Sequence, residues 1–345
     1  MIQEKVLNWG MEVRSLVSDR AKALVKLGQS AYLEICSMPD LFHYQQDIGK
    51  SVGCKLGKQL ERAEKAVAQA KQSTKQQAKE QLKKLQEIYQ SYRQQIEQIN
   101  KVVHPLNEQD EWTNILAVEK KLLQCLRSID GIAKQVGIEI AIDKAEKILA
   151  QINPIAQGIQ SWISFTKADL DTWQAAKIIS PEEKQWLITF AIPYVYWQIQ
   201  LNRTQAKAKN QNLRTSYQQR LKQAKEKWEN SHLKNVLSLQ RLETLLAMAY
   251  QIAISFQRAS SQTEGRNGYL AFVNHAHRGM SSERLKVLTV IHNYDIKRVD
   301  GTTPAQRLFG KEFPDLFEFL CQNVTGFKEP KTRKRNALYI NVLQR

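Results

Sequence analysis

A short apolar stretch near the start of the chain ends on a carboxylate of the kind that metal-dependent phosphoryl chemistry uses. In EVRSLVSD, Leu16 and Val17 predict a short buried strand that ends at Ser18 and Asp19. Carboxylates at the carboxyl end of a strand point into a crevice where metal ions are held. An aspartate after a strand is also a common helix N-cap, so Asp19 alone does not identify a site.

A second segment, PDLFH, contains Asp40 and His43. Residues three apart lie on one face of a helix, so the carboxylate of Asp40 is placed to orient His43, or His43 to approach a metal ion or a phosphate. The alternative interpretation is a hydrogen-bonded pair on the protein surface.

A third segment, SSQTEGRNG, places Glu264 beside Arg266 and Asn267 among small polar residues. It follows a long helical stretch, and its composition is typical of a site rather than of a core. We interpret Glu264 as a candidate site residue, and Arg266 and Asn267 as candidate DNA contacts, with an ordinary polar turn as the alternative.

Glycine separates a helical middle from two ends of different composition. Between residues 58 and 264 only Gly131, Gly137 and Gly158 occur, and the stretch is rich in strong helix formers. The sequence therefore predicts a mainly α-helical protein with a large helical block.

Within this block the apolar residues from Leu82 to Val103 follow alternating steps of three and four, which is a heptad pattern. The helix is expected to end at His104, because Pro105 disfavours the helical conformation of the residue before it. A similar pattern over 60–70 predicts a helical hairpin within one chain, with a dimeric coiled coil as the alternative.

Local signals mark further helices. Ser180 and Thr303, each followed by proline, predict N-caps. Between residues 202 and 258 there is neither Gly nor Pro, and six apolar residues predict a buried face: Leu233, Val236, Leu237, Leu242, Leu245 and Leu246. Six tryptophans of the helical block are expected mainly in the core, with stacking on unpaired DNA bases as the alternative: Trp112, Trp162, Trp173, Trp186, Trp197 and Trp228.

The net charge of +17 over 345 residues predicts attraction to polyanions, of which nucleic acid is the commonest. A solvated basic surface and an anionic membrane are the alternatives. Basic residues also gather near the end of the chain, where they suit phosphate contacts or form a solvated terminus: Lys328, Lys331, Arg333, Lys334 and Arg335.

Other compositional features narrow the class of protein. No run approaches 18 uncharged apolar residues and no secretory h-region is present, so we expect a cytoplasmic protein with no membrane partner. The four cysteines form no CxxC pair, which argues against a disulfide framework and against a cysteine zinc site.

Five segments follow one another along the chain in this order: VSDRAKAL, PDLFH, a large helical block, SSQTEGRNG and HNYDIKRVDGTTPAQRLFG. In that order they resemble the C-terminal portions of bacterial DDE transposases with an RNase H-like fold. The resemblance implies that Asp19 matches the second catalytic aspartate and Glu264 the closing glutamate, while Asp40 and His43 match a D-x-x-H element. It also implies a helical insertion within a partial RNase H-like α/β domain.

We therefore divide the chain into a partial RNase H-like segment (1–58), an all-helical insertion (59–255), a C-terminal RNase H-like segment (256–325) and a basic tail (326–345). DDE chemistry uses two divalent ions, held by carboxylates on both sides. The sequence before Asp19 has only Glu4 and Glu12 as acidic residues and no room for three preceding strands. We expect a truncated or split transposase that binds DNA, lacks the N-terminal part and is catalytically incomplete alone.

Mg²⁺ is expected only if another polypeptide completes the site, either a separately encoded N-terminal half or a second copy of the chain. Two other classes of protein are alternatives to a transposase. One is a helical nucleic-acid-binding or scaffold protein without catalytic ancestry, assembled through the hairpin at 59–103. The other is a self-sufficient nuclease, for which only two candidate metal carboxylates are present.

Overall fold

The computed structural model describes residues 13–18, 35–204, 210–259, 281–297 and 301–323. These residues are mainly helical, as the sequence predicts. The chain divides into two compact units, Met1–Ser260 and Ser261–Arg345.

Two short strands form a parallel pair in the first unit. Strand β1 (Ser15–Ser18) pairs with β2 (Cys36–Pro39), with Ser15 opposite Cys36 and Ser18 opposite Pro39. The predicted strand ending at Ser18 is confirmed. In the described part of the chain these two strands make up the whole sheet, and the larger RNase H-like sheet remains a prediction. Because the two strands are parallel, their carboxyl ends lie at the same edge of the sheet.

Helix α8 (Ile152–Ala175) packs against this strand pair. At Gly158 the helix comes so close to β2 that an added Cβ would lie 2.7 Å from the Cβ of Met38. The side chain of Arg14, just before β1, forms an ion pair with Asp169 and lies over the ring of Phe165. The strand pair is therefore fixed to the helical block along one helix.

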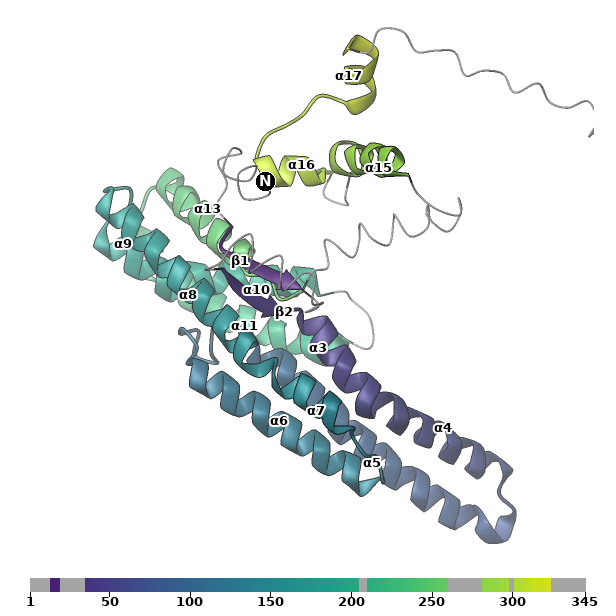
Figure 1. Ribbon diagram of the computed structural model, residues 1–345. Coiled ribbons are helices and arrows are strands. Elements are labelled where there is room, and N and C mark those ends of the chain that lie inside the picture. The colour runs from purple at the N-terminus through teal and green to yellow at the C-terminus, as the bar shows by residue number, and fades with distance from the viewer. Residues whose placement is uncertain (1–12, 19–34, 205–209, 260–280, 298–300, 324–345) are drawn as a thin grey trace, which may run out of the picture. The chain divides into compact units, whose positions relative to one another are not determined.

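A continuous helical rod begins directly after β2. It consists of α3 (Leu41–Ile48), the π-helical turn η1 (Gly49–Gly53) and α4 (Cys54–Gln69). Ala70 and Lys71 then adopt extended backbone angles, and α5 (Gln72–Val102) returns alongside α4 (Figure 1). The predicted hairpin within one chain is confirmed, and α5 ends within two residues of the expected position.

The described part of the first unit also contains the helices α6 (Ile115–Gln135), α7 (Ile142–Leu149), α9 (Pro181–Trp186), α10 (Ile192–Arg203), α11 (Gln211–Glu229), α12 (His232–Val236) and α13 (Leu239–Ser255), and the π-helical turn η2 (Leu187–Ala191). The six tryptophans of this block are buried or packed against its core, as expected. Of the residues predicted to form a buried face over 233–246, Leu245 is fully buried. The prediction is wrong for Val236. Val236 is 63% exposed because it lies at the end of the single-turn helix α12.

Both predicted N-caps are confirmed. Ser180 begins α9 and forms a capping box with Glu183, and Thr303 begins α16 and forms one with Gln306. In the second unit the structure describes α15 (Ser282–Tyr294), α16 (Pro304–Phe309) and α17 (Leu316–Asn323). Helix α16 ends at Gly310, whose φ of 64° is a left-handed conformation that favours glycine.

Candidate functional site

The carboxyl ends of β1 and β2 meet the segment that leaves α13. The backbone N–H of Asp40 donates to the carbonyl oxygen of Ser18 at 2.7 Å. The next N–H, that of Leu41, donates to the carbonyl oxygen of Arg258 at 2.8 Å. Two consecutive amides thus hold together three segments that are far apart in the sequence.

Asp40 occupies the junction of β2 and α3 and is almost fully buried, at 1% exposure. Its Oδ1 accepts hydrogen bonds from the backbone N–H groups of Phe42, at 2.7 Å, and of His43, at 3.3 Å. Asp40 therefore precedes the helix as its N-cap rather than sharing a helical face with His43. The ring of His43 packs edge-on against Phe42, with the ring centroids 5.4 Å apart.

The guanidinium group of Arg258 fixes the segment after α13. It donates hydrogen bonds to backbone and side-chain acceptors from α5, α10, α11 and the residues after α5: the carbonyl oxygens of Asn100 (3.2 Å) and Val103 (3.4 Å), Gln200 Oε1 (3.3 Å), Tyr217 OH (3.1 Å) and His104 Nε2 (3.1 Å). All five are neutral acceptors. Because charge-assisted hydrogen bonds are stronger than neutral ones, this one side chain holds the end of α13 against three other helices.

His104 is buried beside Arg258 and is neutral. Its Nδ1 lies 2.6 Å from Tyr196 OH, and its Nε2 lies 3.0 Å from Tyr217 OH. Burial, together with the charges of Arg258 and Arg220, holds the pKa of His104 well below its usual value of 6.5. Since Arg258 donates to Nε2, the proton of the neutral ring is assigned to Nδ1, which donates to Tyr196.

A second buried polar group lies next to this cluster. Trp197 Nε1 donates to Asp110 Oδ1 at 2.9 Å, and Lys227 Nζ lies 2.7 Å from Asp110 Oδ2. The guanidinium group of Arg220 lies over the ring of Trp197, 4.9 Å from its centroid. These contacts join the loop after α5 to α10 and α11 and so stabilise the fold.

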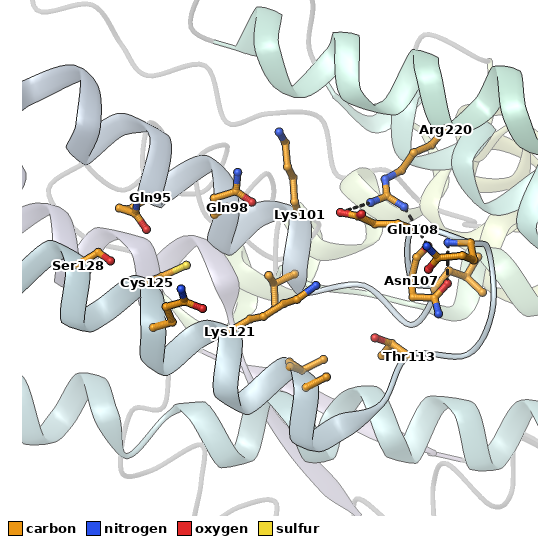
Figure 2. Close-up of a pocket in the computed structure, with 16 residues that line it drawn as sticks. Gln95, Gln98, Lys101, Asn107, Glu108, Thr113, Lys121, Cys125, Ser128 and Arg220 are labelled. Atoms are coloured by element: carbon orange, nitrogen blue, oxygen red, sulfur yellow. Dashed lines mark hydrogen bonds and ion pairs between the residues drawn. The ribbon is translucent and has the colours of Figure 1, made fainter. Parts of the chain in front are cut away.

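A polar hollow of about 560 Å³ opens between the C-terminal part of α5, the loop that follows it, and α6. Figure 2 shows Gln95, Gln98 and Lys101 along one side and Lys121 and Ser128 along the other. At its end, Arg220 donates to the carbonyl oxygen of Asn107 and forms an ion pair with Glu108. Glu108 is the one carboxylate among the lining residues, and they include no histidine.

Most of the predicted site residues lie outside the described residues. These are Asp19, Glu264, Arg266, Asn267, Lys328, Lys331, Arg333, Lys334 and Arg335. The structure does bring together their neighbours: Ser18 directly precedes Asp19, and Arg258 lies six residues before Glu264. Among the described ranges, no group of three His, Cys, Asp or Glu side chains is placed to hold a metal ion.

Part of the chain is similar to a known family. Residues 187–336 match a family of unknown function (DUF6399). The match begins at η2 and covers Arg258 and Glu264, whereas the strand pair and the hairpin lie outside it. No curated protein and no solved structure matches the chain. In the part of the chain that the structure describes, no helix combines the length and apolar character that a membrane span requires.

Proposed function

We propose that this chain is a DNA-binding part of a DDE-type transposase, in which an all-helical insertion interrupts an RNase H-like domain. One observation carries the proposal: Asp40 and Leu41 bind the carbonyl oxygens of Ser18 and Arg258. In a parallel sheet the functional side chains gather at the carboxyl ends of the strands. Asp19 follows the end of β1, and Asp40 follows the end of β2.

The same two hydrogen bonds are what an inserted domain requires. A domain is tolerated within another when its two ends are close together. The helices between β2 and Arg258 run from Leu41 to Ser255, and so include residues 41–58, which we assign from the sequence to the partial RNase H-like segment. Leu41 and Arg258 are hydrogen-bonded to each other.

The candidate carboxylates are too few for a complete two-ion site. A two-ion site needs carboxylates on both sides of the ions. Asp19 and Glu264 are the candidate ligands for Mg²⁺, and Oδ1 of Asp40 already caps α3. We therefore expect residues 1–345 alone to bind DNA without cutting or joining it, and another polypeptide to supply the missing carboxylate.

The charge of +17 supports the DNA partner. Phosphate contacts release counterions, so the logarithm of the binding constant falls linearly with the logarithm of the salt concentration. Such contacts carry no base specificity. A cytoplasmic location belongs to the same proposal.

A fluorescence-anisotropy titration of two unrelated labelled duplexes, at rising salt concentration, tests this function. We expect both duplexes to bind with similar affinity at low salt, and both affinities to fall steeply as salt rises. Absence of binding at low salt, or binding that does not depend on salt, overturns the proposal.

A further inference from the structure

Helix α5 begins with a regular row of exposed lysines. Lys75, Lys79 and Lys83, here called the lysine row, are spaced four residues apart and are all exposed. Lys71, the N-cap of α5, continues the same spacing. Residues four apart are neighbours on one face of a helix, and each step advances about 6 Å along the axis.

In the described part of the chain, the lysine row forms no ion pair of its own, unlike several lysines on other helices. Lys134, Lys222 and Lys225 each have a carboxylate partner four residues away on their own helix. Over the described residues, no ion pair involves Lys75, Lys79 or Lys83. Like charges at this spacing destabilise a helix, so an anionic partner would relieve a repulsion that the chain itself leaves in place.

The rest of the hairpin adds to this positive charge. Between residues 55 and 90 it has nine basic residues (Lys55, Lys58, Arg62, Lys65, Lys71, Lys75, Lys79, Lys83 and Lys84) against four acidic ones (Glu61, Glu64, Glu80 and Glu87). Of the acidic residues, Glu61 pairs with Lys65, and Glu80 accepts a hydrogen bond from Gln76. Figure 1 shows the turn between α4 and α5 at the end of the hairpin remote from the strand pair, where a long ligand meets few other elements.

We propose that the lysine row binds the phosphate backbone of duplex DNA. This inference rests on the proposed function and names the surface that performs its binding step. From Lys75 to Lys83 the row extends about 12 Å, a length over which one DNA strand presents about three or four phosphates at 3.4 Å each. Lysines are flexible point charges, so the row binds without reading the base sequence.

The packing of α5 favours DNA over a membrane surface. A membrane-bound helix needs an apolar face that is free to enter the lipid. The apolar side chains that follow the lysine row, Leu85, Ile88 and Tyr89, pack against the hydrophobic core of the protein. These three side chains are half-buried against the protein, and the row itself consists of exposed charged side chains.

The test compares two triple variants of the full chain. K75Q/K79Q/K83Q removes the lysine row, and K134Q/K222Q/K225Q removes three exposed lysines of α6 and α11 with the same change in charge. Glutamine and lysine have similar helix propensities, and circular dichroism verifies that both variants are folded. Affinity for a labelled duplex is measured from low to moderate salt, and K75R/K79R/K83R tests whether charge alone restores binding.

We expect the row variant to lose about 2 to 3 units of salt slope and roughly 100-fold in affinity at 0.1 M salt, because each phosphate contact contributes about 0.9 to the slope. The control and arginine variants keep the wild-type slope. If the row variant binds as the wild type does, the inference is overturned while DNA binding stands. A wild type that binds no duplex overturns both. If the row variant loses binding to phosphatidylserine vesicles while its DNA binding is unchanged, the row binds membranes and the inference is overturned.

Discussion

Leu41 donates its backbone N–H to the carbonyl oxygen of Arg258 at 2.8 Å, and so joins the first residue of α3 to the segment that follows α13. The neighbouring amide, that of Asp40, holds Ser18 at the end of β1. The helical block therefore leaves and returns to the strand pair at one point. The position of the helical block at the strand ends therefore depends on the contacts that hold Arg258 in place.

Replacing Arg258 by methionine is expected to destabilise the first unit by about 3 kcal/mol, because each buried acceptor left without a donor costs about 1 to 3 kcal/mol. His104 Nε2 and Gln200 Oε1 are among the acceptors that lose this donor. Arg62→Met, on the exposed surface of α4, is the matched control and is expected to stay within about 0.5 kcal/mol. Urea unfolding followed by circular dichroism measures both. A loss below about 1 kcal/mol for Arg258→Met would show that Arg258 is not the anchor.

Stability is expected to fall as the pH drops below about 6.5, the pKa of an unfolded histidine. In the folded state His104 has a pKa well below that value, because it is buried beside Arg258 and Arg220. Below pH 6.5 the unfolded chain therefore binds a proton that the folded chain does not, and the free energy of unfolding decreases by up to about 1.4 kcal/mol per pH unit. Comparing the unfolding free energy of the wild type and His104→Asn at pH 5 to 7.5 isolates this contribution. Equal slopes in both proteins would exclude His104 as its source.

Gly158→Ala is expected to cost about 1 to 3 kcal/mol, because the added methyl group overlaps a packed side chain. The new Cβ would lie 2.7 Å from the Cβ of Met38, which has no room to move away from α8 without shifting β2. Gly131→Ala, on α6 with nothing within 4 Å of the new Cβ, is the control. It is expected to gain about 0.5 to 1 kcal/mol from helix propensity. Thermal unfolding of both variants gives the comparison, and a neutral Gly158→Ala would contradict close packing of the strands on α8.

Residues 1–345, purified alone, are expected to show only background cleavage or joining of DNA in Mg²⁺ or Mn²⁺. Two candidate carboxylates, Asp19 and Glu264, do not suffice to hold two ions. The assay places the wild type beside Asp19→Ala and Glu264→Ala, which distinguishes its own activity from that of a contaminating nuclease. Activity in the wild type that disappears in both variants would mean that another residue of this chain completes the site.

Local signals predicted local structure well. The strand end at Ser18 and the capping boxes at Ser180 and Thr303 depend on residues within a few positions of one another. The position of the break between α4 and α5 was not predictable, because Ala70 and Lys71 adopt extended angles without any glycine or proline to mark it.

The tertiary contacts at the candidate site gave no sequence signal. Nothing in the sequence around His104 or Arg258 marks them as partners. The hydrogen bonds of His104 to Tyr196 and Tyr217, each about a hundred positions away from it, and to Arg258 form only in the folded chain. Gly158 likewise looked like one glycine in a helical stretch, and its role depends on Met38 in a distant strand. The prediction of Asp19 and Glu264 relied on the order of short motifs. The structure adds that the carbonyl oxygens of Ser18, next to Asp19, and of Arg258, six residues before Glu264, accept hydrogen bonds from adjacent amides.

The most direct test is whether Asp19 and Glu264 come together. A bifunctional maleimide with a short linker is applied to Asp19→Cys/Glu264→Cys in a chain with Cys36, Cys54 and Cys321 replaced by serine and the buried Cys125 replaced by alanine. Asp19→Cys/Lys75→Cys, with its second cysteine in the lysine row, is the control pair. We predict that mass spectrometry of the digested protein finds a bridge between positions 19 and 264 and none in the control, because carboxylates that share two ions lie within about 12 Å of each other. Full modification of both thiols at 19 and 264 without a bridge would contradict a shared site.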